Sequence, residues 1–299
     1  MICMCRRACI LFAMIFVTLA GCAQNEVLPK EEGSDVVLQG DKPVKVLLVG
    51  IDTRGEEKSR SDAILVAQIN PADNSLKILS LMRDTYVRIP GYKKGFNKLN
   101  TAYYLGGKEL LAETVKENFG IEIDHTVTVD FKGFAQAVNA LAPEGIEVDV
   151  PQKIIDDMKM DTEPGLQNLS GDDLLKYVRF RHDDENDFGR VKRQQEVVVK
   201  LKEAFSSQFT SLQGIVSIPA HIQDVSKYIE TDLSVTDMIS LATMLYGIPL
   251  DEVETMTIPV PGGFDNKTYE HAGAVLQLDI KANNAAISEF FTMPAEAVN

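Results

Sequence analysis

Cysteine is confined to the first 22 residues of this 299-residue sequence, as Cys3, Cys5, Cys9 and Cys22. The rest of the chain has no thiol for a disulfide, a zinc site or a nucleophile, so cysteine enzymes are excluded. The four histidines are scattered, and the sequence has no His-Glu-x-x-His zinc motif, no Gly-x-Ser-x-Gly elbow and no Walker loop. Three common routes to hydrolysis or phosphate binding are therefore missing.

Positive charge is also scarce, with 30 Lys and Arg against 44 Asp and Glu and a formal net charge of −14. Binding to nucleic acid without sequence preference depends on a basic surface that meets phosphates. The composition therefore predicts no nucleic-acid partner, and any site for an anion must be local.

The N-terminus has the pattern of an export signal. Arg6 and Arg7 precede an apolar run of about twelve residues, which is short for a membrane span of roughly twenty. Leu-Ala-Gly-Cys at 19–22 resembles a bacterial lipobox, which is cut before a cysteine that is then acylated. We predict a signal peptide at 1–21 and lipidated Cys22 at the extracytoplasmic face of the membrane; the alternative is an uncleaved membrane helix. Residues 22–42 are polar and predicted to be a flexible tether.

The remainder, 43–299, predicts one α/β domain. Strands are indicated by short apolar runs at 44–52, 62–71, 74–84, 126–129, 145–151, 253–260 and 274–280. Helices are indicated at 106–120, 131–141, 170–178, 191–207, 234–247 and the C-terminus. The alternation predicts a sheet sandwiched by helices. The main motifs fall within 44–205, and 206–299 is either an α/β extension of the domain or a small separable unit.

Arginines gather in the segment 178–195. If 177–181 is extended, Arg179 and Arg181 share one face; if a helix begins near residue 187, Arg190 and Gln194 share the face of its first turn. Guanidinium groups match phosphate oxygens bidentately, so a diphosphate is a natural ligand. The alternative is a solvated surface network, in which the arginines are neutralised by Asp183, Asp184, Glu185 and Asp187.

Two aspartates at predicted strand ends suggest a metal site. Asp52 ends the first strand and Asp62 precedes the second. Mg²⁺ commonly takes one or two protein carboxylates and completes its shell with water and substrate phosphate. The alternative is that each is an ordinary turn residue.

Further cations lie near these strand ends. Arg83 follows the third predicted strand, Asp84 could brace it, and Lys98 begins a helical segment, while Arg60 lies on the loop before the second strand. Taken singly, each is also explained as loop or surface charge.

Seven segments resemble, in order and near their spacing, the LytR-CpsA-Psr family of Gram-positive cell walls. They are LLVGIDTR, RSDAILVAQINP, SLMRDTYVRIPG, NKLNTAYYLGG, GIEVDVP, GLQNLSGDDLLKYVRFRHD and DFGRVKRQQEV. The resemblance implies a mixed central β-sheet sandwiched by helices. It also implies an enzyme that moves a glycopolymer, of teichoic-acid or capsule type, from a polyprenyl-pyrophosphate carrier to peptidoglycan through a phosphodiester bond.

The resemblance also implies site roles. Asp52 and Asp62 match the metal aspartates, which take Mg²⁺ (or Mn²⁺). Arg60, Arg83 and Asp52 are the expected catalytic residues. The expected pyrophosphate-binding set is Arg83, Lys98, Arg179, Arg181, Arg190 and Gln194. Leu81-Met82 stands where the family usually has Ile-Pro before this arginine, and Glu144 replaces one glycine of a usual pair.

Three other functions stay open at this stage. One is a membrane-associated regulator of the transcriptional-attenuator type, which as an exported acidic chain could act only indirectly. A second is a polyprenyl-pyrophosphate binder without catalysis. A third is a pyrophosphatase that uses the same site with water as the acceptor.

Overall fold

The computed structural model describes residues 42–52, 59–209 and 212–292. The predicted signal peptide, Cys22 and all of the predicted tether except Lys42 lie outside the described residues. No helix in the described ranges is long and apolar enough to cross a membrane.

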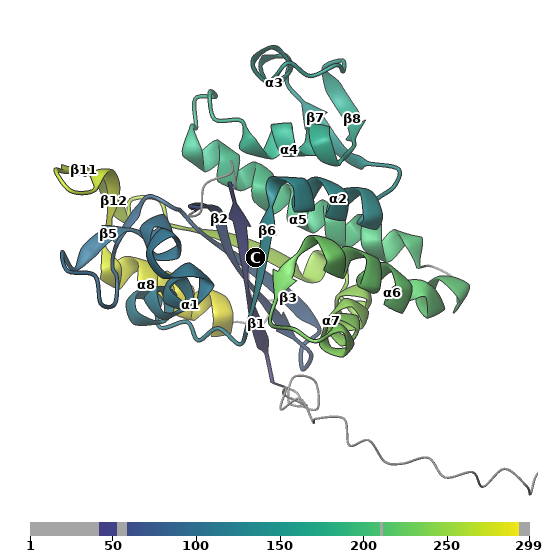
Figure 1. Cartoon of the computed structure of the whole chain (residues 1–299), viewed down its shortest axis with the longest axis horizontal. Coiled ribbons are helices and arrows are strands. Elements are labelled where there is room, and N and C mark those ends of the chain that lie inside the picture. The colour runs from purple at the N-terminus through teal and green to yellow at the C-terminus, as the bar shows by residue number, and fades with distance from the viewer. Residues whose placement is uncertain (1–41, 53–58, 210–211, 293–299) are drawn as a thin grey trace, which may run out of the picture. The chain divides into compact units, whose positions relative to one another are not determined.

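The centre of the fold is a six-stranded mixed sheet in the order β10-β3-β2-β1-β6-β9 (Figure 1). Its first three strands in sequence, β1 (Val44–Ile51), β2 (Ser61–Asn70) and β3 (Ser75–Leu81), are antiparallel neighbours. A turn at 71–74, with the sequence Pro-Ala-Asp-Asn, joins β2 to β3. β6 (His125–Asp130) pairs parallel with β1, and β10 (Val253–Ile258) pairs parallel with β3. β9 (Glu230–Thr231) forms the other edge.

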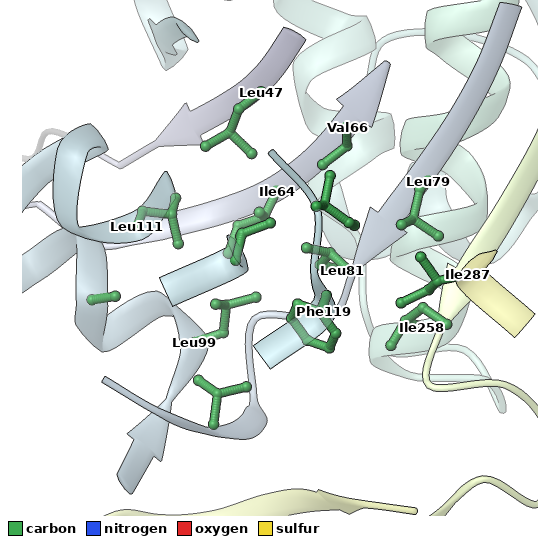
Figure 2. Close-up of a cluster of buried hydrophobic side chains, with 14 of the residues drawn as sticks. Leu47, Ile64, Val66, Leu79, Leu81, Leu99, Leu111, Phe119, Ile258 and Ile287 are labelled. Carbon is green, nitrogen blue, oxygen red and sulfur yellow. The ribbon is translucent and has the colours of Figure 1, made fainter. Parts of the chain in front are cut away.

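Alternating apolar residues give this sheet two buried faces. On β1, Leu47 and Val49 join the core cluster that includes helices α1 (Leu99–Phe119) and α8 (Ile280–Thr292) (Figure 2). Val44 and Val46 face the opposite side, toward α5 (Asp187–Gln208) and α7 (Val235–Gly247). α6 (Leu212–Val225) packs against α7 on this side. The expected α-β-α sandwich is confirmed, because a strand with two apolar faces needs a helical layer on each.

Two smaller sheets flank this sandwich. One has the order β11-β12-β4-β5 and is formed by β4 (Thr85–Arg88), β5 (Phe96–Lys98), β11 (Phe264–Tyr269) and β12 (Gly273–Leu278). The other pairs β7 (Ile146–Val150) with β8 (Gly165–Leu169). Around it pack α2 (Phe131–Leu141), α3 (Gln152–Met158) and α4 (Gly171–Arg179). Through β10 and β12, the C-terminal extension is an integral part of both larger sheets.

The extended conformation considered for 177–181 is not the one that the chain adopts. Helix α4 continues through Arg179, and Phe180 caps it with φ −61° and ψ 140°. The physical reason is burial at helical spacing: Leu174, Tyr177 and Val178 all lie in one apolar cluster with β7 and α5. Arg179 and Arg181 therefore do not alternate along a strand.

Helix α4 begins in close contact with α2, which gives a sharp stability prediction. A Cβ added at Gly171 would lie 2.0 Å from the carbonyl oxygen of Ala135, a backbone atom that cannot rotate away. We expect Gly171→Ala to lower the free energy of unfolding by about 3 kcal/mol through overpacking. Gly247→Ala is the matched control, because nothing lies within 4 Å of the added methyl group. Urea denaturation of both variants measures the difference, and equal midpoints would contradict the contact.

Candidate active site

Strand pairing brings Asp52 and Asp62 together at one end of the neighbouring strands β1 and β2, in the middle of the central sheet. Ile51 pairs with Ser61 and Gly50 pairs with Ala63, so Asp62 is the extra residue of a β-bulge. Asp52 follows directly after β1, and its backbone N–H lies 3.5 Å from the carbonyl oxygen of Arg60. Because β1 and β2 are antiparallel, the C-terminal end of β1 and the N-terminal end of β2 lie side by side.

Arg83, just after β3, is the centre of a network of charges at these strand ends. Its guanidinium forms a salt bridge with Asp62, and it lies 3.7 Å from a carboxylate oxygen of Asp84 and 3.7 Å from one of Asp187. Burial lowers the pKa of Arg83, but the three carboxylates together outweigh burial and raise it. The side chain is 17% exposed, so a ligand can still reach it.

Arg190 lies deeper, in the first turn of α5. Its guanidinium donates to Asp187 at 2.9 Å, and its side chain is only 4% exposed. Burial, then repulsion from Arg83 and a smaller repulsion from Arg181, lower its pKa to about 10. Arg190 is thus a buried cation at neutral pH that lies near other cations, which is unfavourable unless anions are close.

Five buried polar atoms of this region have no hydrogen-bond partner among the described residues. They are Nε of Arg83, Nε of Arg190, Oδ1 of Asp187 and the hydroxyl oxygens of Ser61 and Thr85. Buried polar groups in native proteins are almost always satisfied by protein, water or a ligand. The Arg83 side chain, which is 17% exposed, offers the guanidinium group of this region that a phosphate group can reach directly.

The other predicted anion-binding residues are distributed around this centre. Lys98 contacts Asp84, with 2.8 Å between Nζ and the carboxylate. Arg179 lies 4.1 Å over the ring of Phe131, and Arg181 is exposed just after α4. Gln194 is half-buried on α5, one turn after Arg190. Arg60 is exposed and stacks at 5.6 Å over Tyr104, so the described contacts do not include it in the Arg83 network.

The acidic segment 183–187 has two separate roles. Asp183 and Glu185 form ion pairs with Arg193 and Lys192, at 2.6 Å and 2.5 Å, and so hold the loop against α5. Asp187 instead joins Arg83 and Arg190. The ion pairs expected for the surface-network alternative are therefore those of Lys192 and Arg193 with this segment. The sequence analysis did not distinguish Asp187 from the other three acids of this segment. The only signal that singles it out is its spacing of three residues from Arg190, which brings the two side chains together on a helix.

One cavity adjoins the site and a second lies farther along α5. The first, of about 640 Å³, is lined by Asp84, Asp187 and, from the C-terminal extension, Pro261, Asn266 and Leu276. No motif or periodicity pointed to these last three residues. An apolar one of about 280 Å³ lies between the sheet and helices α5, α6 and α7, and Val198, Leu201 and Ala242 are among its lining residues.

The two aspartates suit a hard divalent cation that is shared with a substrate. No group of three or more His, Cys, Asp or Glu in the described ranges could hold a metal ion. Asp52 and Asp62 nevertheless supply two carboxylates from adjacent strand ends. This set fits Mg²⁺ only if water and phosphate oxygens complete the coordination.

Comparison with known proteins gives relatives that cover most of this chain. The Staphylococcus aureus "Regulatory protein MsrR" is 33% identical over 254 residues, which are 85% of this chain and 76% of the relative. The Enterococcus faecalis "Polyisoprenyl-teichoic acid--peptidoglycan teichoic acid transferase TagU" is 38% identical over 221 residues, 73% of this chain and 70% of the relative.

A solved structure and a family model agree with these relatives. The structure described as "TagT bound to LI-WTA" superposes with a TM-score of 0.66 at 30% identity, and the match covers 83% of this chain and 89% of that one. The LytR_cpsA_psr family model matches residues 11–287. Fold, motifs and relatives thus agree, and the chain belongs to the LytR-CpsA-Psr family.

Proposed function

We propose that this protein transfers a glycopolymer from a polyprenyl-pyrophosphate carrier to peptidoglycan through a phosphodiester bond and releases polyprenyl phosphate. The observation that carries the proposal is the pair of guanidinium groups, Arg83 and Arg190, held by carboxylates in one network, together with an apolar cavity farther along α5. A pyrophosphate with an apolar tail satisfies both features. The names of TagU and TagT·LI-WTA support a teichoic-acid-type polymer as the substrate class.

The geometry favours electrostatic catalysis. A hydroxyl group of the acceptor attacks the phosphorus that bears the glycan, and negative charge grows on the oxygen that leaves with the polyprenyl phosphate. Arg83, Arg190 and Lys98 are already held by carboxylates, so they can meet this charge without rearranging. Arg179 at the end of α4, Arg181 just after it and Gln194 on α5 are proposed to bind the outer phosphate oxygens. Asp84, which contacts both Arg83 and Lys98, is a candidate general base.

Asp52 and Asp62 are the residues proposed to hold Mg²⁺ (or Mn²⁺). When bound there, the ion supplies positive charge to phosphate oxygens. Arg83 supplies positive charge beside Asp62 from the protein itself.

The apolar cavity is the proposed place of the polyprenyl tail. Gln194, at the phosphate end of α5, and Val198, in the cavity wall, are four residues apart, which is about 6 Å along a helix. A molecule with a charged head and an apolar tail can therefore bridge the two places along one helix.

Filling this cavity gives a selective prediction. Ala242 is buried in its wall, and Ala242→Phe is expected to raise KM for a long-chain polyprenyl donor about tenfold while sparing a short-chain donor. Thr243→Phe is the control, because Thr243 is the next residue and lies on the exposed side of α7. Steady-state kinetics with both donors provide the measurement. An equal effect on both donors would place the tail elsewhere.

The test of the function is a transfer assay with purified protein, a radiolabelled polyprenyl-pyrophosphate glycan and peptidoglycan. Label in peptidoglycan together with released polyprenyl phosphate supports the proposal. Donor binding without turnover would indicate the non-catalytic binder, and free phosphoglycan formed without peptidoglycan would indicate a pyrophosphatase. A regulator would show neither binding nor turnover of the donor.

The site of action proposed for the enzyme is the extracytoplasmic face of the membrane, with lipidated Cys22 as the anchor. The lipobox-like sequence before Cys22 motivates this part of the proposal. Mass spectrometry of the mature N-terminus decides it: an acylated cysteine is expected, and an intact Met1 would favour the uncleaved helix.

A further inference from the structure

Four aromatic side chains form a continuous row on the small sheet β11-β12-β4-β5. The ring of Tyr86 stacks on Tyr269 at 4.5 Å and on Phe96 at 5.6 Å between centroids. His271 lies about equally far from Tyr86 and Tyr269, at 6.1 Å and 6.0 Å. We call these four residues the aromatic row.

The aromatic row lies on the solvent side of its sheet. Along β4, Thr85 and Val87 are fully buried, whereas Tyr86 between them points to the other face, as strand alternation requires. Phe96 is 44% exposed, a large value for a phenylalanine in a paired strand. Leu276 and Leu278 of β12 make apolar core contacts on the other side of this sheet.

Polar groups border the rings. Nε2 of His271 lies 3.0 Å from the carbonyl oxygen of Phe96, which can only accept, so this nitrogen donates. The same nitrogen lies 3.2 Å from the hydroxyl oxygen of Tyr86, whose own proton can therefore be donated elsewhere. Tyr269 donates to the side-chain oxygen of Gln277 at 3.1 Å. Because Tyr86 stacks on both neighbours, the row offers the exposed ring of Phe96 together with ring edges and hydroxyl, imidazole and amide groups. This set suits a pyranose, which has apolar C–H faces and a rim of hydroxyl groups.

The aromatic row is continuous with the candidate active site. Tyr86 pairs directly with Lys98, and Lys98 contacts Asp84, the residue that also approaches Arg83. A saccharide on the row can therefore reach the phosphate centre without a gap.

The position of the aromatic row identifies which saccharide it would hold. The small sheet lies on the α1 and α8 side of the central sheet, and the apolar cavity lies on the α5, α6 and α7 side (Figure 1). In phosphoryl transfer the attacking and leaving oxygens are roughly in line. If the leaving polyprenyl phosphate lies toward the apolar cavity, the attacking hydroxyl group approaches from the opposite side, where the row is.

We propose that Tyr86, Phe96, Tyr269 and His271 form the subsite for the acceptor, on which sugar rings of a peptidoglycan glycan strand stack. This inference rests on the proposed transferase function, and it adds a specificity-determining surface to it. The row orients the glycan strand so that a sugar hydroxyl group is presented beside Lys98 and Asp84.

The experiment is calorimetric titration of the full-length protein in detergent with a peptide-free tetrasaccharide of alternating N-acetylglucosamine and N-acetylmuramic acid. Phe96→Ala and Tyr269→Ala are each expected to weaken binding about fivefold, since each removes one stacking ring. Tyr269→Phe keeps the ring and is expected to bind within about twofold of the wild type. Leu166→Ala, which removes an apolar side chain that is 67% exposed on β8, is the matched control and leaves the affinity unchanged. Thermal unfolding verifies that each variant is folded.

Kinetics separate the acceptor from the donor. The two alanine variants should raise KM for peptidoglycan about fivefold and leave KM for the polyprenyl donor unchanged; a rise for the donor alone would overturn the assignment. Transfer by the wild type with equal tetrasaccharide affinity in all variants would refute the subsite and leave the proposed function standing. Tetrasaccharide binding that depends on the rings, with no transfer by the wild type, would refute the function and leave a saccharide site.

Discussion

Arg190→Ala is expected to lower kcat/KM for glycopolymer transfer by about 10²- to 10³-fold, the usual cost of removing one preorganised donor to a developing negative charge. Arg190 is suited to this role because its guanidinium is fixed by Asp187 at 2.9 Å and buried beside Arg83. Removal also leaves Asp187 with Arg83, at 3.7 Å, as its only described cationic partner. The loss is therefore expected in both donor binding and turnover.

The control for this prediction is Lys192→Ala. Lys192 lies two residues farther along α5, is 65% exposed and pairs with Glu185. An exposed ion pair contributes at most about 1 kcal/mol, so this variant should retain nearly full activity. Initial rates with the radiolabelled donor give the comparison. Equal activity of the two variants would remove Arg190 from the phosphate site.

Asp62→Asn is expected to change metal-dependent and metal-free behaviour in opposite directions. Transfer in the presence of Mg²⁺ should fall by roughly 100-fold, because an amide is a much weaker ligand than a carboxylate for a hard cation. Binding of inorganic pyrophosphate without any divalent ion should instead become tighter, because Arg83 loses the carboxylate that competes with the ligand.

Two measurements check the Asp62 prediction independently. Transfer rates across a Mg²⁺ titration report the metal site, and calorimetry with pyrophosphate in a chelator reports Arg83. Asp161→Asn is the control, since Asp161 is exposed in the loop before β8. Weaker pyrophosphate binding in metal-free Asp62→Asn would show that this carboxylate supports the anion site instead of competing for its arginine.

The residue pattern was sufficient for the central sandwich. Strands β1, β2 and β3 and helices α2, α5 and α7 lie close to where apolar periodicity indicated them, because each buries one or two faces in the cores around the sheet. Helix α5 starts at Asp187, four residues before the predicted helix at 191–207. This start meets the condition under which Arg190 and Gln194 share one face of the helix. The local sequence predicts these elements because buried apolar residues recur at the helical spacing in a helix and at every second position in a strand.

The arrangement of the charges could not be obtained in the same way. Arg179 was expected beside Arg181 on a strand, but three buried residues continue α4 through Arg179 and set its guanidinium over Phe131. Asp187 was one of four similar acids, yet it alone of the segment 183–187 contacts both Arg83 and Arg190. Such pairings join distant segments, and no local period records them.

The sequence by itself thus determined the elements of the sandwich, the family resemblance and the charged residues at the strand ends and helix start. Tertiary structure alone decided that Asp62, Arg83, Asp187 and Arg190 form one network, and that β10 and β12 make the C-terminal part integral to the sheets. It also assembled the aromatic row from β4, β5 and the β11–β12 hairpin. The physical reason is that hydrophobic burial is encoded residue by residue along the chain, whereas the meeting of charges and rings depends on long-range strand pairing.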